Sequence, residues 1–318
     1  MNSRKGVFLY LPFVDVTIWN SFAKFEKYFT EITRYMNYEE QLQFLISNAL
    51  AEDIGDGDHS TLSSIDPGTK GKAVLKIKQD GVLAGVSVAE TIFRYMQPDI
   101  SFTSFMHDGD VMQSGERAFE VHADVHTILQ CERLVLNSMQ RMSGIATLTR
   151  KYTDKLKGYK TKLLDTRKTT PNFRLLEKEA VRIGGGVNHR FGLYDMIMLK
   201  DNHIDYCGGI ELAIKKAYSY VQNHKPGLKI EVETRNIDDV KKVLATGLVN
   251  RIMLDNFTPE LISEALVLID GKYETEASGG INYNNIEAYA ATGVDYISSG
   301  AIIHQAVSLD LSLKAIIV

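Results

Sequence analysis

The sequence predicts an α/β fold in which the second half of the chain forms a (β/α) barrel, closed or incomplete. After residue 158, short apolar runs alternate with amphipathic helical patterns. From Glu233 through Asp255 and Ser278 to Ser299, the polar strand ends recur about every twenty-two positions, and right-handed crossovers would place these ends on one face. A doubly wound sheet would instead carry a G-x-G-x-x-G turn after its first strand, whereas the triple glycine at 184–186 follows a predicted helix.

Length and composition limit the classes of function. The chain has 318 residues, 44% apolar and 24% charged, as is usual for a globular protein that buries a large core. Its net charge of −4 argues against nucleic acid as an obligatory partner. The two cysteines, Cys131 and Cys207, have neither metal-ligand spacing nor a disulfide framework, which indicates a reducing cytoplasm.

The first 36 residues are expected to form an arm whose role the sequence does not reveal. Arg4 and Lys5 precede the apolar segment 7–19, but Pro12 and Asp15 interrupt it and no small-residue cleavage site follows. This segment is too short to span a bilayer, so neither a signal peptide nor a membrane partner is expected. A start at Met36 is the alternative to an ordered arm.

The next segment reads as a helix followed by β structure. Helical spacing predicts a helix over 38–52, and the acidic, glycine-containing stretch 52–61 fits a turn from helix to sheet better than a calcium loop. A strand is expected over 73–78 and a short helix over 88–96. Residues 108–110 are expected to form a hairpin turn.

A strong helix is predicted over 127–142. His122 and His126 are four residues apart, as metal ligands on a helix would be, but they lie where a strand should end. Incidental surface histidines are therefore the preferred interpretation. Arg133 lies within the helix, and its spacing alone gives no reason to assign it a function.

The barrel is expected to contain six strands and four later helices. The strands are predicted over 161–165, 196–200, 228–233, 251–255, 274–278 and 294–299, and the helices over 209–224, 237–246, 259–269 and 284–292. An earlier helix is expected over 172–182.

The stretch from Leu163 to His203 predicts the functional site. Apolar runs at both of its ends are followed at once by polar clusters, as expected where a buried parallel strand opens into a site. Arg167, Lys168, Arg190 and Lys200 are expected to converge with few acids to neutralise them. Such a pocket suits a small polyanion.

Other predicted strand ends add phosphate-binding and acidic groups. The turns Ser278-Gly279-Gly280 and Ser299-Gly300 come late in the barrel, where backbone amides and a helix N-terminus commonly hold a phosphate. Glu233 and Asp255 end two successive strands. They could hold ribose hydroxyls, bind Mg²⁺ or stabilise a positive sugar carbon.

The order of these motifs resembles the quinolinate phosphoribosyltransferase family over about residues 38–310. The matching stretches are EDIGDGDHST, ERLVLNSMQRMSGIAT, DTRKTTP, GGGVNHRFGLYDMIMLKDNH, EVET, MLDNF, EASGGI and YISSGAI. The pair formed by TRKTTP and the HR…KDNH block is the most specific part of this resemblance.

The resemblance implies an open α/β barrel of the TIM type beside an N-terminal α/β sandwich domain. Its expected boundaries are an arm over 1–36, the sandwich over 37–145, completed by a C-terminal helix within 304–318, and the barrel over 146–303. The family works as a homodimer with shared active sites, and a larger assembly stays open. Arg133 matches the arginine that reaches the neighbouring subunit's site and its substrate carboxylate.

The implied reaction joins quinolinate to 5-phosphoribosyl-1-pyrophosphate (PRPP) with Mg²⁺, giving nicotinate mononucleotide, pyrophosphate and CO₂, a step of NAD biosynthesis. Lys168, Lys200, Glu233 and Asp255 are expected to act in catalysis. Glu233 and Asp255 would also hold Mg²⁺, partly through the substrate. By resemblance the substrate-binding residues are these four with Arg133, Arg167, Thr169, His189, Arg190, Ser278, Gly279, Gly280, Gly300, Ala301 and Ile302.

Three alternatives differ in substrate or in activity. A related molybdenum-associated protein of the same fold would use another ring substrate, but the intact TRKTTP and HR motifs suit a dicarboxylate. A catalytically silent anion-binding paralogue should have lost some of Arg167, Lys168, Lys200, Glu233 and Asp255, and this chain retains them all. A nicotinate phosphoribosyltransferase would not need so many cations.

Overall fold

The structure, a computed structural model, describes residues 36–316. The predicted N-terminal arm, apart from Met36, lies outside the described residues. Helix α2 (Tyr38–Ile54) begins the described fold. Residues 36–42 group apart from the rest, and the chain from Gln43 onward forms one compact unit that contains both large sheets. The expected division of this unit at residues 145 and 146 stays a prediction.

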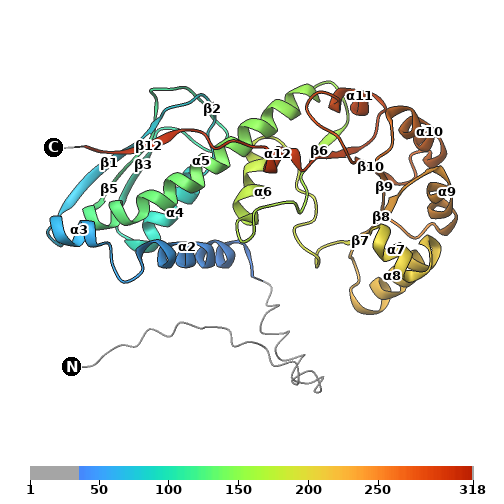
Figure 1. The fold of residues 1–318 in the computed structure, drawn as a ribbon, viewed down its shortest axis with the longest axis horizontal. Helices are drawn as coiled ribbons and strands as arrows, with labels where there is room; N and C mark the ends of the chain where they lie inside the picture. Colours follow the sequence, from blue (N-terminus) through green and yellow to red (C-terminus); the bar gives the residue numbers. More distant parts are fainter. Residues whose placement is uncertain (1–35, 317–318) are drawn as a thin grey trace, which may run out of the picture. The chain divides into compact units, whose positions relative to one another are not determined.

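The first large sheet is antiparallel and has four strands. Their order is β12 (Leu311–Ile316), β1 (Lys70–Ile77), β5 (Arg117–Asp124) and β3 (Ser101–Ser104). Helices α4 (Val86–Met96) and α5 (Val125–Lys155) run beside this sheet (Figure 1). The rings of Phe93, Phe102 and Phe119 pack between helix and sheet, with centroids 4.6–6.4 Å apart. This is a helix-on-sheet layer with an apolar core.

The C-terminal segment is a strand, so the expectation of a C-terminal helix was wrong. Strand β12 pairs antiparallel with β1, and Leu313 lies opposite Leu75. Leu311 and Leu313 are buried and Ser312 between them is only partly so, which is the alternation that a strand requires. Residues Leu311–Ile316 therefore extend the first sheet through their backbone.

Two local predictions before β5 were also wrong. After a turn over residues 55–58, a short helix, α3 (His59–Ser64), comes before the sheet, and Asp58 caps it by accepting a hydrogen bond from the Thr61 amide. Residues 108–110 do not join paired strands, because β4 (Val111–Met112) pairs with β2 (Gly81–Val82). The Asp108 carboxylate instead accepts the first amides of α4.

Helix α5 continues 13 residues beyond the predicted end at Met142. Gly144 lies within this helix and does not end it. A side chain at this position would overlap the carbonyl oxygen of Val307. Gly144 thus allows the backbone of the residue 307 region to lie directly against the helix. The same helix then reaches from the first sheet to the second.

The second large sheet is an open barrel of six parallel strands, as predicted. Its order is β6 (Lys162–Leu164), β11 (Tyr296–Ser298), β10 (Glu274–Ser278), β9 (Arg251–Asp255), β8 (Ile230–Thr234) and β7 (Ile197–Leu199). Strands β6 and β7 are the two edges, so the sheet does not close. The predicted bounds of β9 and β10 match the structure.

Helices flank the barrel strands along the chain (Figure 1). They are α6 (Arg174–Ile183), α7 (Asp201–Cys207), α8 (Ile210–His224), α9 (Ile237–Thr246), α10 (Pro259–Ile269), α11 (Ile286–Ala291) and α12 (Ala301–His304). The predicted bounds of α9 and α10 are confirmed. Asn236 and Thr258 cap these two helices, and Pro259 is the first residue of α10.

Candidate active site

The parallel sheet brings the predicted strand-end residues to one edge. Because neighbouring strands run the same way, their carboxyl ends share that edge. Asp255 and Ser278 are register partners at the ends of β9 and β10. Lys200, which follows β7, places its Nζ 3.1 Å from Glu233 Oε2 on β8. The predicted gathering of Lys200, Glu233, Asp255 and Ser278 is therefore present in the fold.

The two glycine turns lie beside other predicted site residues. Gly279 has a φ of 89°, and a side chain there would overlap the Asn256 amide group, so the turn fits closely against the end of β9. A Cβ at Gly300 would lie 3.2 Å from Lys168 Cδ, so the lysine stem passes over this turn. Ala301 and Ile302 are buried, which leaves their backbone as the part that could meet a phosphate.

Three arginines form what we call the guanidinium cluster: Arg167, Arg174 and Arg190. Among the described residues, no carboxylate lies within ion-pair distance of any of them, and Arg167 Nε is buried without a hydrogen-bond partner. Burial lowers the pKa of Arg174 and of Arg190, and the charge of Arg167 lowers both further. The cluster thus concentrates positive charge that an anion would stabilise.

Arg174 also joins the two loops that carry the cluster. Its guanidinium donates to Thr169 Oγ1 at 2.9 Å, to the Phe191 carbonyl at 3.0 Å and to the Arg167 carbonyl at 3.4 Å. The Thr169 hydroxyl, predicted to bind substrate, therefore already accepts a hydrogen bond from the protein. A buried pair, Lys178 Nζ and Asp165 Oδ1 at 2.5 Å, ties the same loops, because Asp165 Oδ1 accepts the His189 amide.

His189 belongs to a second group of charges, the buried ion network, which it forms with Glu231, Glu276 and Arg251. Its Nε2 lies 3.0 Å from Glu231 Oε2 and 3.2 Å from Glu276 Oε2. Its Nδ1 lies 2.6 Å from the Arg190 amide nitrogen. Both ring nitrogens thus face protein atoms, and the substrate contact expected for His189 stays a prediction.

The protonation of His189 is set by opposing influences. Burial lowers the pKa of His189, but Glu231 and Glu276 outweigh it and raise the pKa to about 9. The Arg190 amide at Nδ1 favours the neutral ring instead. Two buried carboxylates at hydrogen-bond distance are the stronger influence, because a full charge acts more strongly than one amide dipole.

The network contains donors that could hold a metal, but its charges argue against one. His189, Glu231 and Glu276 form the candidate group of metal ligands found among the described residues. Arg251 already supplies a cation there, with its Nη1 3.2 Å from Glu276 Oε2. A divalent ion would sit beside that guanidinium. His122 and His126 do not belong to this group.

The residues expected to hold Mg²⁺ fit such an ion. Burial raises the pKa of Asp255, and the carboxylate of Glu233 raises it further, while Lys200 opposes the shift. Two carboxylates that repel each other at one strand edge can be stabilised by a shared cation. Oxygen ligands suit Mg²⁺, which commonly takes one or two carboxylates and completes its shell with substrate phosphates and water.

Arg133 stands apart from these residues within one chain. It is exposed on α5, and no hydrogen bond or ion pair joins its side chain to another described residue. Its predicted contact with a neighbouring subunit's substrate stays a prediction.

Some of the charged residues were missed by sequence reasoning, although their spacing carried a signal. Arg174, Glu177 and Lys178 are at positions i, i+3 and i+4 of a predicted helix and so share one face. Glu231 and Glu276 lie two residues before Glu233 and Ser278, and therefore face the same side of their strands. A charged residue two positions before a strand-end residue therefore indicates a second layer of charged side chains beneath the site.

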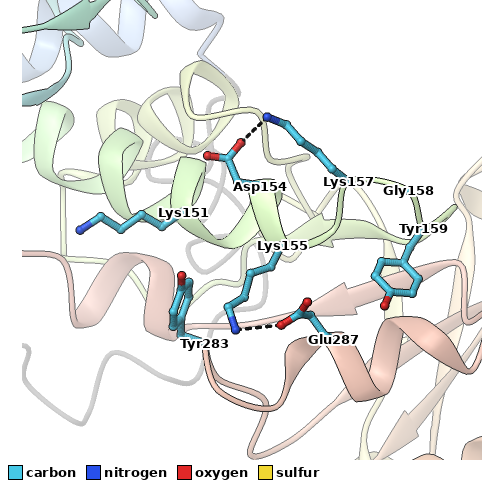
Figure 2. A pocket seen from close by; sticks show the side chains of 8 residues that line it. All are labelled: Lys151, Asp154, Lys155, Lys157, Gly158, Tyr159, Tyr283 and Glu287. Atoms are coloured by element: carbon cyan, nitrogen blue, oxygen red, sulfur yellow. Dashed lines mark hydrogen bonds and ion pairs between the residues drawn. The ribbon is translucent and has the colours of Figure 1, made fainter.

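A pocket of about 620 Å³ lies at the end of α5 and contains none of the predicted site residues. Figure 2 shows Lys155 reaching between Tyr283 and Glu287. Its Nζ lies 2.9 Å from Glu287 Oε2 and 4.3 Å from the centre of the Tyr283 ring. Tyr283 also packs edge-on against Tyr152 of α5. These contacts anchor the segment that follows Gly280.

No helix in the described part of the chain combines the length and apolar character needed to cross a membrane.

Two family models match: the N-terminal domain of quinolinate phosphoribosyl transferase over residues 58–143 and its C-terminal domain over 145–314. Together these models match most of the chain.

Named relatives and a solved structure agree with these models. The chloroplastic nicotinate-nucleotide pyrophosphorylase [carboxylating] of Oryza sativa subsp. japonica is 43% identical over 86% of this chain and 77% of its own. A probable enzyme of the same name from Bacillus subtilis is 41% identical over 86% and 93%. The crystal structure of NadC from Streptococcus pyogenes is 39% identical, has a TM-score of 0.81 and covers 90% and 100%. The chain therefore belongs to the quinolinate phosphoribosyltransferase family.

Proposed function

We propose that the protein transfers the phosphoribosyl group of PRPP to quinolinate, with loss of CO₂, and thereby makes nicotinate mononucleotide for NAD biosynthesis. The guanidinium cluster is the observation that carries this assignment. Arg174 donates its hydrogen bonds to protein oxygens, whereas Arg167 Nε has no partner, and no described carboxylate lies within ion-pair distance of the cluster. Cations without a counter-charge suit a flat dianion with two carboxylates. A monocarboxylate would leave part of this charge unbalanced.

The strand edge supplies the other half of the proposed site. The backbone of the Ser278–Gly280 and Gly300 turns would hold the phosphates of PRPP, and Lys168, which passes over Gly300, would lie beside them. Glu233 and Asp255 would face the ribose and would hold Mg²⁺, partly through the substrate. When bound, Mg²⁺ would offset the charge on the departing pyrophosphate.

The proposed mechanism rests on positioning and electrostatics. The pyridine nitrogen bonds to the ribose C1 as the C1–pyrophosphate bond breaks, with positive charge at C1 that Glu233 and Asp255 stabilise. The quaternised ring then accepts the electron pair of the breaking C2–carboxylate bond. CO₂ departs and a proton takes its place at C2. This scheme requires no nucleophilic side chain.

The assay that tests this function follows two products together. Purified protein with quinolinate, PRPP and Mg²⁺ should form nicotinate mononucleotide and CO₂ in equal amounts, and nicotinate in place of quinolinate should yield no nucleotide. Binding of quinolinate without product would indicate the silent paralogue. Product from nicotinate would contradict the assignment of the substrate.

We also propose a homodimer in which Arg133 of each chain reaches the neighbouring site. The exposed position of Arg133 on α5, away from its own chain's cations, supports this arrangement. Mixing Arg133→Ala chains with Lys200→Ala chains should restore activity, because a mixed dimer would contain one intact site. No recovery in the mixture would contradict a shared site.

A cytoplasmic location completes the proposal. Cys131 and Cys207 are both free, which suits a reducing compartment. The rice relative carries a chloroplastic name, so the compartment differs among relatives. Cell fractionation with detection of the native protein tests this proposal, and recovery in an organelle fraction would contradict it.

A further inference from the structure

A buried ion pair connects α5 with α6 outside the residues assigned so far. The Arg141 guanidinium donates from Nε at 3.0 Å and from Nη2 at 2.8 Å to Glu177 Oε1. Glu177 is fully buried, whereas the Arg141 side chain is 23% exposed. Charged side chains are placed in a protein interior at a substantial desolvation cost, so their remaining contacts indicate what they do.

Glu177 also holds the loop that carries Arg167 and Lys168. Its Oε2 accepts the backbone amide of Thr170 at 2.8 Å, and its Oε1 accepts the Thr170 hydroxyl at 2.9 Å. Thr170 ends the TRKTT segment. Both carboxylate oxygens of Glu177 therefore bond to groups that fix this loop.

Arg141 holds the other side of the site. Its Nη2 donates to the Ile303 carbonyl at 2.9 Å and its Nη1 to the Ala306 carbonyl at 2.7 Å. These carbonyls belong to α12 and the residues after it, directly following the Gly300 turn. Helices α5, α6 and α12 contact one another, and Figure 1 shows them meeting between the two sheets.

We propose that Arg141 and Glu177 are positioning residues that hold the TRKTT loop and the Gly300 turn in one fixed arrangement. The loop carries cations for the dicarboxylate, and the turn would hold a phosphate of PRPP, so the pair sets the two substrates relative to each other. This inference rests on the proposed function for its substrates. Stability alone is a weak explanation, because apolar residues often replace buried ion pairs without loss.

The central variant is Glu177→Gln, which keeps the shape and removes the charge. The amide that replaces the carboxylate presents an NH₂ group to one of the two donors on Thr170, so the loop should be released. The KM values for quinolinate and for PRPP should both rise, each by roughly ten-fold, as expected for one lost hydrogen bond to a charged group. Hydrogen exchange at the Thr170 amide should become faster.

The matched control is Glu179→Gln on the same helix. Glu179 pairs with Arg182 at the surface and touches neither loop. This variant should leave both KM values and the exchange of the Thr170 amide unchanged. An equal rise in both variants would overturn the positioning role, as would a change in only one KM in Glu177→Gln.

A milder variant covers the case in which Glu177→Gln does not fold. Thr170→Val keeps the Arg141–Glu177 pair and removes only the hydroxyl contact, so its melting temperature should stay near that of the wild type. Both KM values should rise by only about two- to five-fold, because the hydroxyl hydrogen bond is lost while the Thr170 amide still donates to the Glu177 carboxylate. Unchanged KM values in a folded Thr170→Val protein would overturn the proposal.

The experiment separates this inference from the proposed function. Wild-type protein that makes no nicotinate mononucleotide refutes the function, and the KM comparison then has no meaning. In that case exchange at the Thr170 amide decides alone. Faster exchange in Glu177→Gln than in Glu179→Gln supports the positioning role of Arg141 and Glu177, and equal exchange overturns it.

Discussion

The guanidinium cluster and the buried ion network use the same kinds of side chain for opposite purposes. In the network, Arg251 and His189 lie within about 4 Å of Glu231 and Glu276, so both signs are present. In the cluster, burial and the charge of Arg167 lower the pKa of Arg174 and of Arg190, and no described carboxylate lies within ion-pair distance of the three arginines. A counter-charge inside the protein indicates a structural role, and its absence indicates a place for a ligand.

The largest effect is expected from removing one counter-charge of the buried ion network, which tests whether that network has a structural role. Arg251→Met would leave two buried carboxylates, Glu231 and Glu276, to share the single counter-charge of His189. The free energy of unfolding should fall by about 3–5 kcal/mol, the usual effect of breaking a buried ion pair. Denaturant titration measures this loss. Arg235→Met, which removes a partly exposed arginine, should cost under about 1 kcal/mol, and an equal loss in both variants would contradict the comparison.

The guanidinium cluster and Lys168, the next residue after Arg167, should respond in the opposite way. Arg190→Ala and Lys168→Ala should lower kcat/KM by about 100- to 1,000-fold, because each removes a cation that faces the substrates. Their melting temperatures should stay near the wild-type value, since loss of one cation relieves repulsion. Steady-state kinetics and thermal unfolding test this contrast. Comparable unfolding of both variants would show that the cluster is structural.

Stability should depend on pH through the network. The pKa of His189 is raised to about 9 in the folded protein, above the unfolded value near 6.5. The charged ring therefore stabilises the fold fully below about pH 6.5, and this contribution is lost as the pH rises through 9. The loss should be of the order of 3 kcal/mol. The raised pKa of Glu231, about 7, acts in the same direction.

Replacement of His189 isolates this effect. His189→Gln should flatten the decline of the unfolding free energy between pH 6.5 and 9, measured by denaturant titration at each pH. An unchanged slope in this variant would assign the pH dependence to other groups. Activity is a poorer readout here, because Arg190 adjoins His189.

A ligand should supply the charge that the cluster lacks. Quinolinate should raise the stability of the wild type by about 2.7 kcal/mol at a concentration of 100 times its Kd. Arg190→Ala should require more quinolinate for the same shift in melting temperature. A shift that does not depend on Arg190 would place the bound dianion elsewhere.

The fold could be predicted from the sequence where the periodicity of the apolar residues and the polar residues at the ends of an element indicated the same structure. Strands such as β9 are short apolar runs that end in one charged residue, and helices such as α10 begin with a capping threonine and a proline. The C-terminal strand was missed because Leu311 and Leu313 alternate over only a few residues, and its partner β1 lies far away in sequence. Such pairing is decided by tertiary contacts.

The site was predictable in its outer layer only. Strand-end residues such as Lys200 and Asp255 can be identified in the sequence because they come directly after apolar runs. Arg141 and Glu177 do not, because each lies in a helix whose polar residues are usually solvated. Whether a helical charge is buried depends on which helix packs against it, and the sequence of one helix does not contain that information.

The central claim is that an unbalanced group of cations selects a dianion. Calorimetric titration of the wild-type protein with quinolinate and with nicotinate tests it most directly, because the two ligands differ in one carboxylate. We expect quinolinate to bind at least about ten-fold more tightly, with most of the difference lost in Arg190→Ala. Equal affinity for both ligands, or a preference that survives in Arg190→Ala, would contradict the account.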